Sequence, residues 1–173
     1  MQQESSYLAN LIQDLLFYSD VILRDERPQL SMQDPKEIAT SALIEKRRQA
    51  EEKGVQLRNE MTGDWPQVAL DSQGLRFALA ALLDNAIKFT PCGGQVSLCG
   101  DIGATSLSLS IKDNGPGISR ENLARVFEKF YQVDPTHTGQ VRGFGLGLYY
   151  ASKFVDDQNG KLTLDSTPGK GTT

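Results

Sequence analysis

The stretch Asp113-Asn114-Gly115-Pro116-Gly117-Ile118 decides how this 173-residue chain is interpreted. It follows Leu107–Lys112, in which apolar and polar residues alternate strictly, as in a half-buried strand. On this alternation Asp113 falls on the apolar face. Because an inward carboxylate is costly unless it accepts good hydrogen bonds, we expect Asp113 to accept one from an amine-bearing planar ligand. A tight turn with a solvated aspartate is the alternative for this stretch taken alone.

Glycines shape two loops of the chain. Gly115 and Gly117 permit close backbone approach or a positive φ, and the proline between them stiffens the loop. The second loop, Gly143-Phe144-Gly145-Leu146-Gly147-Leu148, leads into a helix-like segment that ends at Asp157. Glycines before a helix N-terminus form an anion site, since free N–H groups and the positive end of the dipole face the ligand. The pattern is not a Walker A motif, because no Gly-Lys-Ser/Thr closes it.

One face of a long predicted helix carries polar groups suited to phosphate. Asp71 is expected to cap this helix, which continues to Phe89. Its polar stripe, at spacings i, i+3, i+4 and i+7, consists of Ala81, Asp84, Asn85 and Lys88. An amide oxygen is an acceptable Mg²⁺ ligand, and lysine is a point charge for phosphate. A solvated polar stripe is the alternative.

Composition excludes several classes of function. The net charge is −4, so no basic surface argues for nucleic-acid binding. Cys92 and Cys99 are too few for a disulfide framework and lack metal-ligand neighbours, which favours a reducing, cytoplasmic location. We find no signal peptide and no apolar run of membrane-spanning length, so we expect no membrane contact. The chain is expected to be an excised piece of a longer protein.

The first third of the chain predicts helices. Residues 4–24 carry an a/d seam, which suits either an intermolecular helical bundle or a helix docked on its own domain. Residues 28–33 are expected to be a linker. Asp34-Pro35-Lys36-Glu37 is a strong helix start, and Gly54 is expected to end that helix.

Short strands and a polar loop account for most of the remainder. Strand candidates lie at 55–57, 68–70, around Val96 and Leu98, at 106–112, and around Leu162 and Leu164. A short helix from Ser119 to Phe127 is predicted. The aromatic residues Phe127, Phe130 and Tyr131 then precede a polar segment, 132–142, that is typical of a mobile lid.

Four motifs in this order resemble the N, G1, F and G2 boxes of bacterial two-component sensor histidine kinases. They are Leu82–Thr90, Asp113–Ile118, Phe127–Tyr131 and Gly143–Leu148. The resemblance implies an α+β fold: the two-layer α/β sandwich (Bergerat-type) of the gyrase, Hsp90, histidine kinase and MutL superfamily. A mixed, mostly antiparallel sheet would lie under helices, preceded by one bundle helix. Residues 1–27 would be the end of a dimerisation helix, and 34–173 the catalytic ATP-binding domain, truncated before its last strand.

The resemblance also implies residue roles toward ATP and Mg²⁺. Asn85 would ligate Mg²⁺, Lys88 would contact phosphate, and Asp113 would accept from the adenine amine, with Thr172 helping through water. Aromatic anchors of the lid would be Phe127, Phe130 and Tyr131. The remaining residues implied for ATP binding are Gly115, Gly117, Ile118, Arg142, Gly143, Gly145, Leu146, Gly147 and Leu148.

Several positions depart from the family pattern. Ala81 replaces the first asparagine of the N box, where gyrase-like relatives keep a water-activating glutamate, so little ATP hydrolysis is expected. Lys129 and Gln132 stand where arginine is common, and Arg142 is a candidate to compensate. The sole histidine, His137, lies in the predicted lid and not on a bundle helix. We therefore expect ATP binding without autophosphorylation by the family mechanism.

The resulting hypothesis is the ATP-binding half of a sensor histidine kinase. The γ-phosphoryl group would pass to a histidine on the dimerisation domain and then to a response regulator, with a homodimeric parent. The alternatives are a degenerate nucleotide-sensing or scaffold module, and an anti-sigma-type serine kinase on the same fold.

Overall fold

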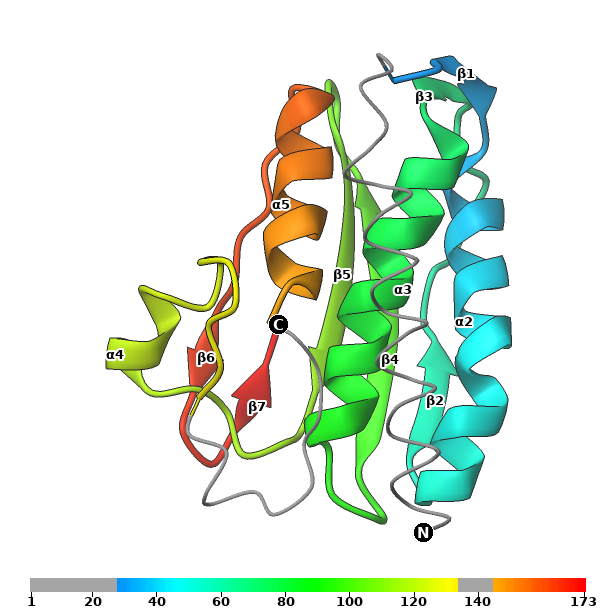
Figure 1. The fold of residues 1–173 in the computed structure, drawn as a ribbon. Coiled ribbons are helices and arrows are strands. Elements are labelled where there is room, and N and C mark those ends of the chain that lie inside the picture. Colours follow the sequence, from blue (N-terminus) through cyan, green and yellow to red (C-terminus); the bar gives the residue numbers. More distant parts are fainter. Residues whose placement is uncertain (1–27, 134–144) are drawn as a thin grey trace, which may run out of the picture.

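The computed structural model describes residues 28–133 and 145–173 (Figure 1). Helices cover one face of a three-stranded sheet, in two layers. The helices of this layer are α2 (Pro35–Lys53), α3 (Ser72–Phe89) and α5 (Gly147–Asp157), and the strands are β2 (Gln56–Asn59), β4 (Gln95–Ile102) and β5 (Leu107–Asp113). The predicted α+β sandwich is thus confirmed. The predicted bundle helix and most of the predicted lid, with His137, lie outside the described residues.

The sheet is mixed, as predicted. Its order is β2-β4-β5, with β2 parallel and β5 antiparallel to β4. The register pairs Leu98 with Ile111 and Val96 with Asp113, so Asp113 shares the face of the buried strand residues. Two small antiparallel pairs complete the described strands: β1 (Ser31–Gln33) with β3 (Val68–Leu70), and β6 (Ser166–Thr167) with β7 (Gly171–Thr172).

Local capping defines the two long helices. The Asp34 carboxylate accepts from the backbone N–H of Lys36 at 2.8 Å, and Gly54 ends α2 in the left-handed conformation with φ +73°. The Asp71 carboxylate accepts from two N–H groups of the first turn of α3, each at 3.1 Å. Both helices therefore begin where the capping residues predicted.

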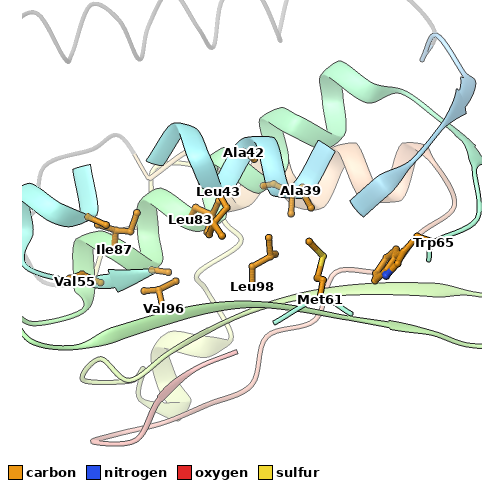
Figure 2. Close-up of a cluster of buried hydrophobic side chains, with 13 residues drawn as sticks. Ala39, Ala42, Leu43, Val55, Met61, Trp65, Leu83, Ile87, Val96 and Leu98 are labelled. Carbon is orange, nitrogen blue, oxygen red and sulfur yellow. The ribbon is translucent and has the colours of Figure 1, made fainter. Parts of the chain in front are cut away.

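The core lies between the helices and the sheet (Figure 2). Leu83 and Ile87 of α3 meet Val96 and Leu98 of β4, and all four are at most 1% exposed. At one end Trp65 packs over β4, where a Cβ on Gly100 would lie 2.4 Å from the indole. The core thus holds α3 and β5 in a fixed relation, and these elements carry most of the predicted site.

Gly74 explains how α5 packs on α3. A glycine inside a helix costs about 1 kcal/mol relative to alanine. Here a Cβ at position 74 would lie 2.0 Å from the ring of Phe154 on α5, so the bare backbone admits that ring. The side chain of Gln158 also accepts from the N–H of Asp71 at 3.2 Å. The glycine therefore serves the helix–helix contact.

Three local predictions differ from the structure. Part of the expected linker is β1, which forms because β3 offers it a strand edge to pair with. The helix after Ser119 is only α4 (Arg120–Leu123), because turn-type hydrogen bonds replace helical ones beyond it. Residues around Leu162 and Leu164 form no strand; the turn at Gly169 instead pairs β6 with β7. Within the described ranges, no helix is long and apolar enough to cross a membrane.

Candidate functional site

Asp113 stands at the end of β5, on the side of the sheet that the helices cover. Its Oδ1 accepts the backbone N–H of Gly115 at 2.8 Å and that of Thr172 at 3.2 Å. No group of the described ranges hydrogen-bonds to Oδ2. One carboxylate oxygen is therefore held in place by the backbone while the other is available as an acceptor.

Burial raises the pKa of the Asp113 carboxyl, and the N–H groups of Gly115 and Thr172 limit the rise. Desolvation disfavours the charged form, whereas each N–H donor favours it. A hydrogen-bond donor brought by a ligand would act in the same direction as these N–H groups. The site thus favours a neutral or cationic donor at Oδ2 over an acceptor.

Glycines allow the chain to close around this carboxylate. Gly117 has φ +70°, and a Cβ there would lie 2.2 Å from the carbonyl oxygen of Thr167. Gly171 has φ +97°, and its Cβ would lie 2.0 Å from the carbonyl oxygen of Asp113. The loop 115–118 and the β6–β7 hairpin therefore form one wall beside the end of β5 (Figure 1). The sequence identified Gly117 but not Gly171.

The C-terminal end of α3 forms the neighbouring wall. The carbonyl oxygen of Phe89 lies 3.2 Å from where a Cβ on Gly115 would stand, and Phe89 is 42% exposed. The Lys88 ammonium lies 5.6 Å from the centre of the Phe89 ring. The backbone of Phe89 therefore lies against the Asp113 loop, and Phe89 is a partly exposed aromatic residue that the sequence analysis did not single out. The sequence does contain a signal for Phe89, since this aromatic residue directly follows Lys88 at the end of the predicted helix.

Lys53 holds this end of α3 in place. Its ammonium donates to the carbonyl oxygen of Ile87 at 2.8 Å and to that of Lys88. Partial burial lowers the pKa of Lys53. A cation at a helix C-terminus also complements the negative end of the helix dipole. Lys53 therefore fixes the backbone that carries Lys88 and Phe89.

The polar stripe of α3 divides into two parts. Asp84 pairs with Lys46 of α2 at 2.8 Å, and Lys53 covers the carbonyl end, so these groups tie α2 to α3. Asn85 is half-buried, and its side chain has no hydrogen-bond partner among the described residues. The amide of Asn85 is therefore the member of the stripe that is available to a ligand or metal.

The N-terminus of α5 has no side-chain cap among the described residues. Its N-cap residue is Leu146, which provides no side-chain hydrogen bond to the first-turn N–H groups of this eleven-residue helix. Leu146 itself is buried beside Phe77 and Tyr150, while Gly147 and Leu148 begin the helix. This geometry suits an anion.

The aromatic motif meets the second glycine loop. The N–H of Phe130 donates to the carbonyl oxygen of Gly145 at 3.1 Å, and a Cβ on Gly145 would lie 2.4 Å from the carbonyl oxygen of Tyr131. The Tyr131 hydroxyl donates to Asn122 at 2.7 Å, and Arg125 lies over its ring at 4.3 Å. Phe130 is 67% exposed. Tyr131 thus packs against α4, whereas Phe130 is mostly exposed.

Most of the predicted site residues can now be placed. The structure brings Asp113, Gly115, Gly117, Ile118 and Thr172 together at one end. The others that it describes belong to the end of α3 or to the segment where the aromatic motif meets α5: Asn85, Lys88, Phe130, Tyr131, Gly145, Leu146, Gly147 and Leu148. Arg142 and Gly143 lie outside the described residues.

Comparisons with known proteins identify the family to which this fold belongs. Residues 70–173 match the family model described as histidine kinase-, DNA gyrase B-, and HSP90-like ATPase. Sensor histidine kinase WalK of Bacillus subtilis is 33% identical over 77% of this chain and 22% of its own length. Histidine protein kinase DivJ of Caulobacter vibrioides is 31% identical over 100% of this chain and 29% of its own length. The crystal structure of full-length ShkA in complex with AMPPNP matches with a TM-score of 0.81 and 26% identity, over 98% of this chain and 35% of that chain.

The fold and the relatives define an ATP-binding catalytic domain of the sensor histidine kinase class. The chain belongs to the family of histidine kinase-, DNA gyrase B-, and HSP90-like ATPases. The scaffold and serine-kinase alternatives are not favoured by these matches. The chain spans between a fifth and a third of the length of these two curated relatives, at 22% and 29%.

Proposed function

We propose that this chain binds ATP with Mg²⁺ and, within a longer protein, transfers the γ-phosphoryl group to a histidine of a dimerisation domain. A response regulator would then receive the phosphate. The observation that carries the proposal is the Asp113 carboxylate, held through Oδ1 by two N–H groups and open at Oδ2. Such an acceptor suits the amine of adenine. The proposal places the domain in the cytoplasm.

The residues at the other end suit the phosphates. The first-turn N–H groups of α5, for which Leu146 provides no side-chain cap, would bind phosphate oxygens, and the Lys88 ammonium would add a positive charge. The Asn85 amide oxygen is of the ligand type that Mg²⁺ accepts, and Mg²⁺ usually keeps waters and phosphate oxygens as its other ligands. When bound, Mg²⁺ would neutralise charge that develops on the β- and γ-phosphates.

Transfer would depend on position and charge. A histidine nitrogen would attack the γ-phosphorus, and the bond from that phosphorus to the bridging oxygen would break, releasing ADP. In phosphoryl transfer the protein mainly aligns the reactants and stabilises charge, so no covalent intermediate with this chain is needed. Residue 81 is alanine, so this position supplies no carboxylate to activate water, and we expect little ATP hydrolysis.

Calorimetric titration with ATP tests the proposal, with and without Mg²⁺. We expect saturable binding that Mg²⁺ strengthens and that Asp113→Ala weakens about a hundredfold. In a second step, the chain is mixed with labelled ATP and a separately purified, histidine-bearing dimerisation domain of a sensor histidine kinase. Label on that domain would support transfer. Binding of ATP without any transfer, across several such domains, would favour a nucleotide sensor, and absence of ATP binding by the folded chain would refute the proposal.

A further inference from the structure

The Ser166 hydroxyl lies where the Asp113 loop meets the C-terminal hairpin. It accepts the backbone N–H of Ile118 at 2.8 Å and donates to the carbonyl oxygen of Gly171 at 2.9 Å. It also lies 3.0 Å from the hydroxyl of Thr172. One hydroxyl thus joins β6, β7 and the glycine loop. Ser166 was not singled out from the sequence, because the residues around it show no clear hydrophobic periodicity.

These contacts determine where the hydroxyl protons go. A carbonyl oxygen can only accept, so the single Ser166 proton is used at Gly171. In the contact between the two hydroxyls, Thr172 must then be the donor. The Thr172 proton is therefore directed toward Ser166, and the Thr172 oxygen can offer only lone pairs to any further partner.

The Thr172 backbone contacts Asp113, and the Thr172 hydroxyl contacts Ser166, which accepts the N–H of Ile118 in the Asp113 loop. The N–H of Thr172 donates to Asp113 Oδ1 at 3.2 Å, and a Cβ on Gly171 would lie 2.0 Å from the Asp113 carbonyl oxygen. Asp113 Oδ2 is an acceptor, and Ser166 makes the Thr172 oxygen an acceptor too. A purine with a 6-amino group brings two N–H donors to such a pair, directly or through a water. A purine with a 6-oxo group brings an acceptor instead.

We propose that Ser166 is a positioning residue that makes this site prefer 6-amino purines over 6-oxo purines. It does so by holding the Thr172 proton away from the ligand and by tying the hairpin to the Asp113 loop. This inference rests on the proposed nucleotide function. Without the serine hydroxyl, the Thr172 proton is free to turn toward the base and donate to a 6-oxo oxygen.

The test is the ratio of affinities for ATP and ITP, measured by titration calorimetry on the whole chain. For Ser166→Ala we expect the preference for ATP to fall about tenfold, the size of one hydrogen bond. The freed Thr172 proton can then donate to the 6-oxo group of ITP, and the Thr172 oxygen no longer serves only as an acceptor for the amine of ATP. Ser166→Thr keeps a hydroxyl and should keep the preference. Thr167→Ala is the matched control: the neighbouring exposed side chain on the same strand, with no side-chain hydrogen bond to a described residue.

A purely structural role would lower both affinities in parallel and leave the ratio unchanged, and that result would overturn the inference. Thr172→Val provides a second route, because it removes the acceptor but keeps the N–H and the shape. Thr172→Val should reduce the preference for ATP over ITP as Ser166→Ala does, and an unchanged affinity ratio would contradict the inference. If the wild type binds no ATP, the proposed function fails and takes this inference with it. If it prefers ATP and Ser166→Ala prefers it equally, only the inference about Ser166 fails.

Discussion

The two ends of the candidate site are built by different kinds of interaction. At the Asp113 end, the carboxylate, two glycines with positive φ and the Ser166 hydroxyl are connected by hydrogen bonds and close backbone contacts. At the α5 end, helix N–H groups lack a side-chain cap, and the Asn85 amide has no partner in the described ranges. The Asp113 end is preorganised, so it selects a ligand by its shape and hydrogen-bond pattern. The α5 end consists of helix dipoles and polar groups, so its binding depends on the ion that it holds.

The comparison predicts that base recognition depends most on Asp113. Asp113→Ala removes the acceptor and leaves the N–H groups of Gly115 and Thr172 without their partner. We expect ATP affinity to fall about a hundredfold, since a hydrogen bond to a charged group is worth about 1.5–3 kcal/mol. Calorimetry measures this effect, with Asp101→Ala, an exposed carboxylate at the far end of the sheet, as control. Equal affinities for the two variants would mean that the base binds elsewhere.

The close approach between the β6–β7 hairpin and the backbone of Asp113 can be tested by substituting two glycines of this hairpin. Both Gly169 and Gly171 have positive φ, so alanine strains each of them. Only at Gly171 would the new Cβ also meet the backbone of Asp113, whereas nothing lies within 4 Å at Gly169. We expect Gly171→Ala to lower the free energy of unfolding by about 2 kcal/mol more than Gly169→Ala does, in urea titrations. Similar decreases in the free energy of unfolding for the two variants would show that the hairpin backbone does not pack closely against β5.

The other end should respond to the metal. Asn85→Ala is expected to lower ATP affinity about tenfold in the presence of Mg²⁺ and hardly at all without it, because the amide oxygen acts through the ion. Asp84→Asn serves as the neighbouring control, since Asp84 pairs with Lys46 and faces α2. Its ATP affinity should stay within about twofold. A Mg²⁺-independent loss in Asn85→Ala would assign the amide to direct contact with ATP.

The smallest predicted effect is a pH dependence of stability at Asp113. Because burial raises the pKa of Asp113 in the folded protein, the folded form binds a proton more readily than the unfolded chain between the two pKa values. The carboxylate therefore destabilises the free protein as pH rises through that window and stays unfavourable above it. Asp113→Asn should be more stable than the wild type at pH 7, by less than about 1 kcal/mol because the group is half exposed.

Urea unfolding at a series of pH values measures this difference. The advantage of Asp113→Asn should shrink as pH falls through the raised pKa and vanish below the ordinary range of aspartate. Other titrating groups are common to both proteins and cancel. An advantage that grows toward acid would show that the N–H donors, and not burial, dominate the environment of Asp113.

Elements with local signals were predictable to within a residue or two. The starts of α2 and α3 follow from aspartate caps, and the end of α2 follows from Gly54. The alternation that ends at Asp113 predicted both β5 and the inward face of its last residue. Strands β1, β6 and β7 were not predicted, because two or three residues carry too little pattern and form only when a partner strand is nearby.

Local patterns by themselves singled out the residue types of the candidate site and their order: an amide and a lysine on one helix, a carboxylate before a glycine loop, and glycines before a helix. The roles proposed for them came from the family resemblance. Only the tertiary structure decided which oxygen of Asp113 is open, that Asp84 faces Lys46 and not the site, and that Gly74 makes room for Phe154. The contacts of Ser166 with Ile118 and of Thr172 with Asp113 join residues 48 and 59 positions apart. Periodicity and capping act within a few residues, so contacts at such separations exist only once the core has brought the elements together.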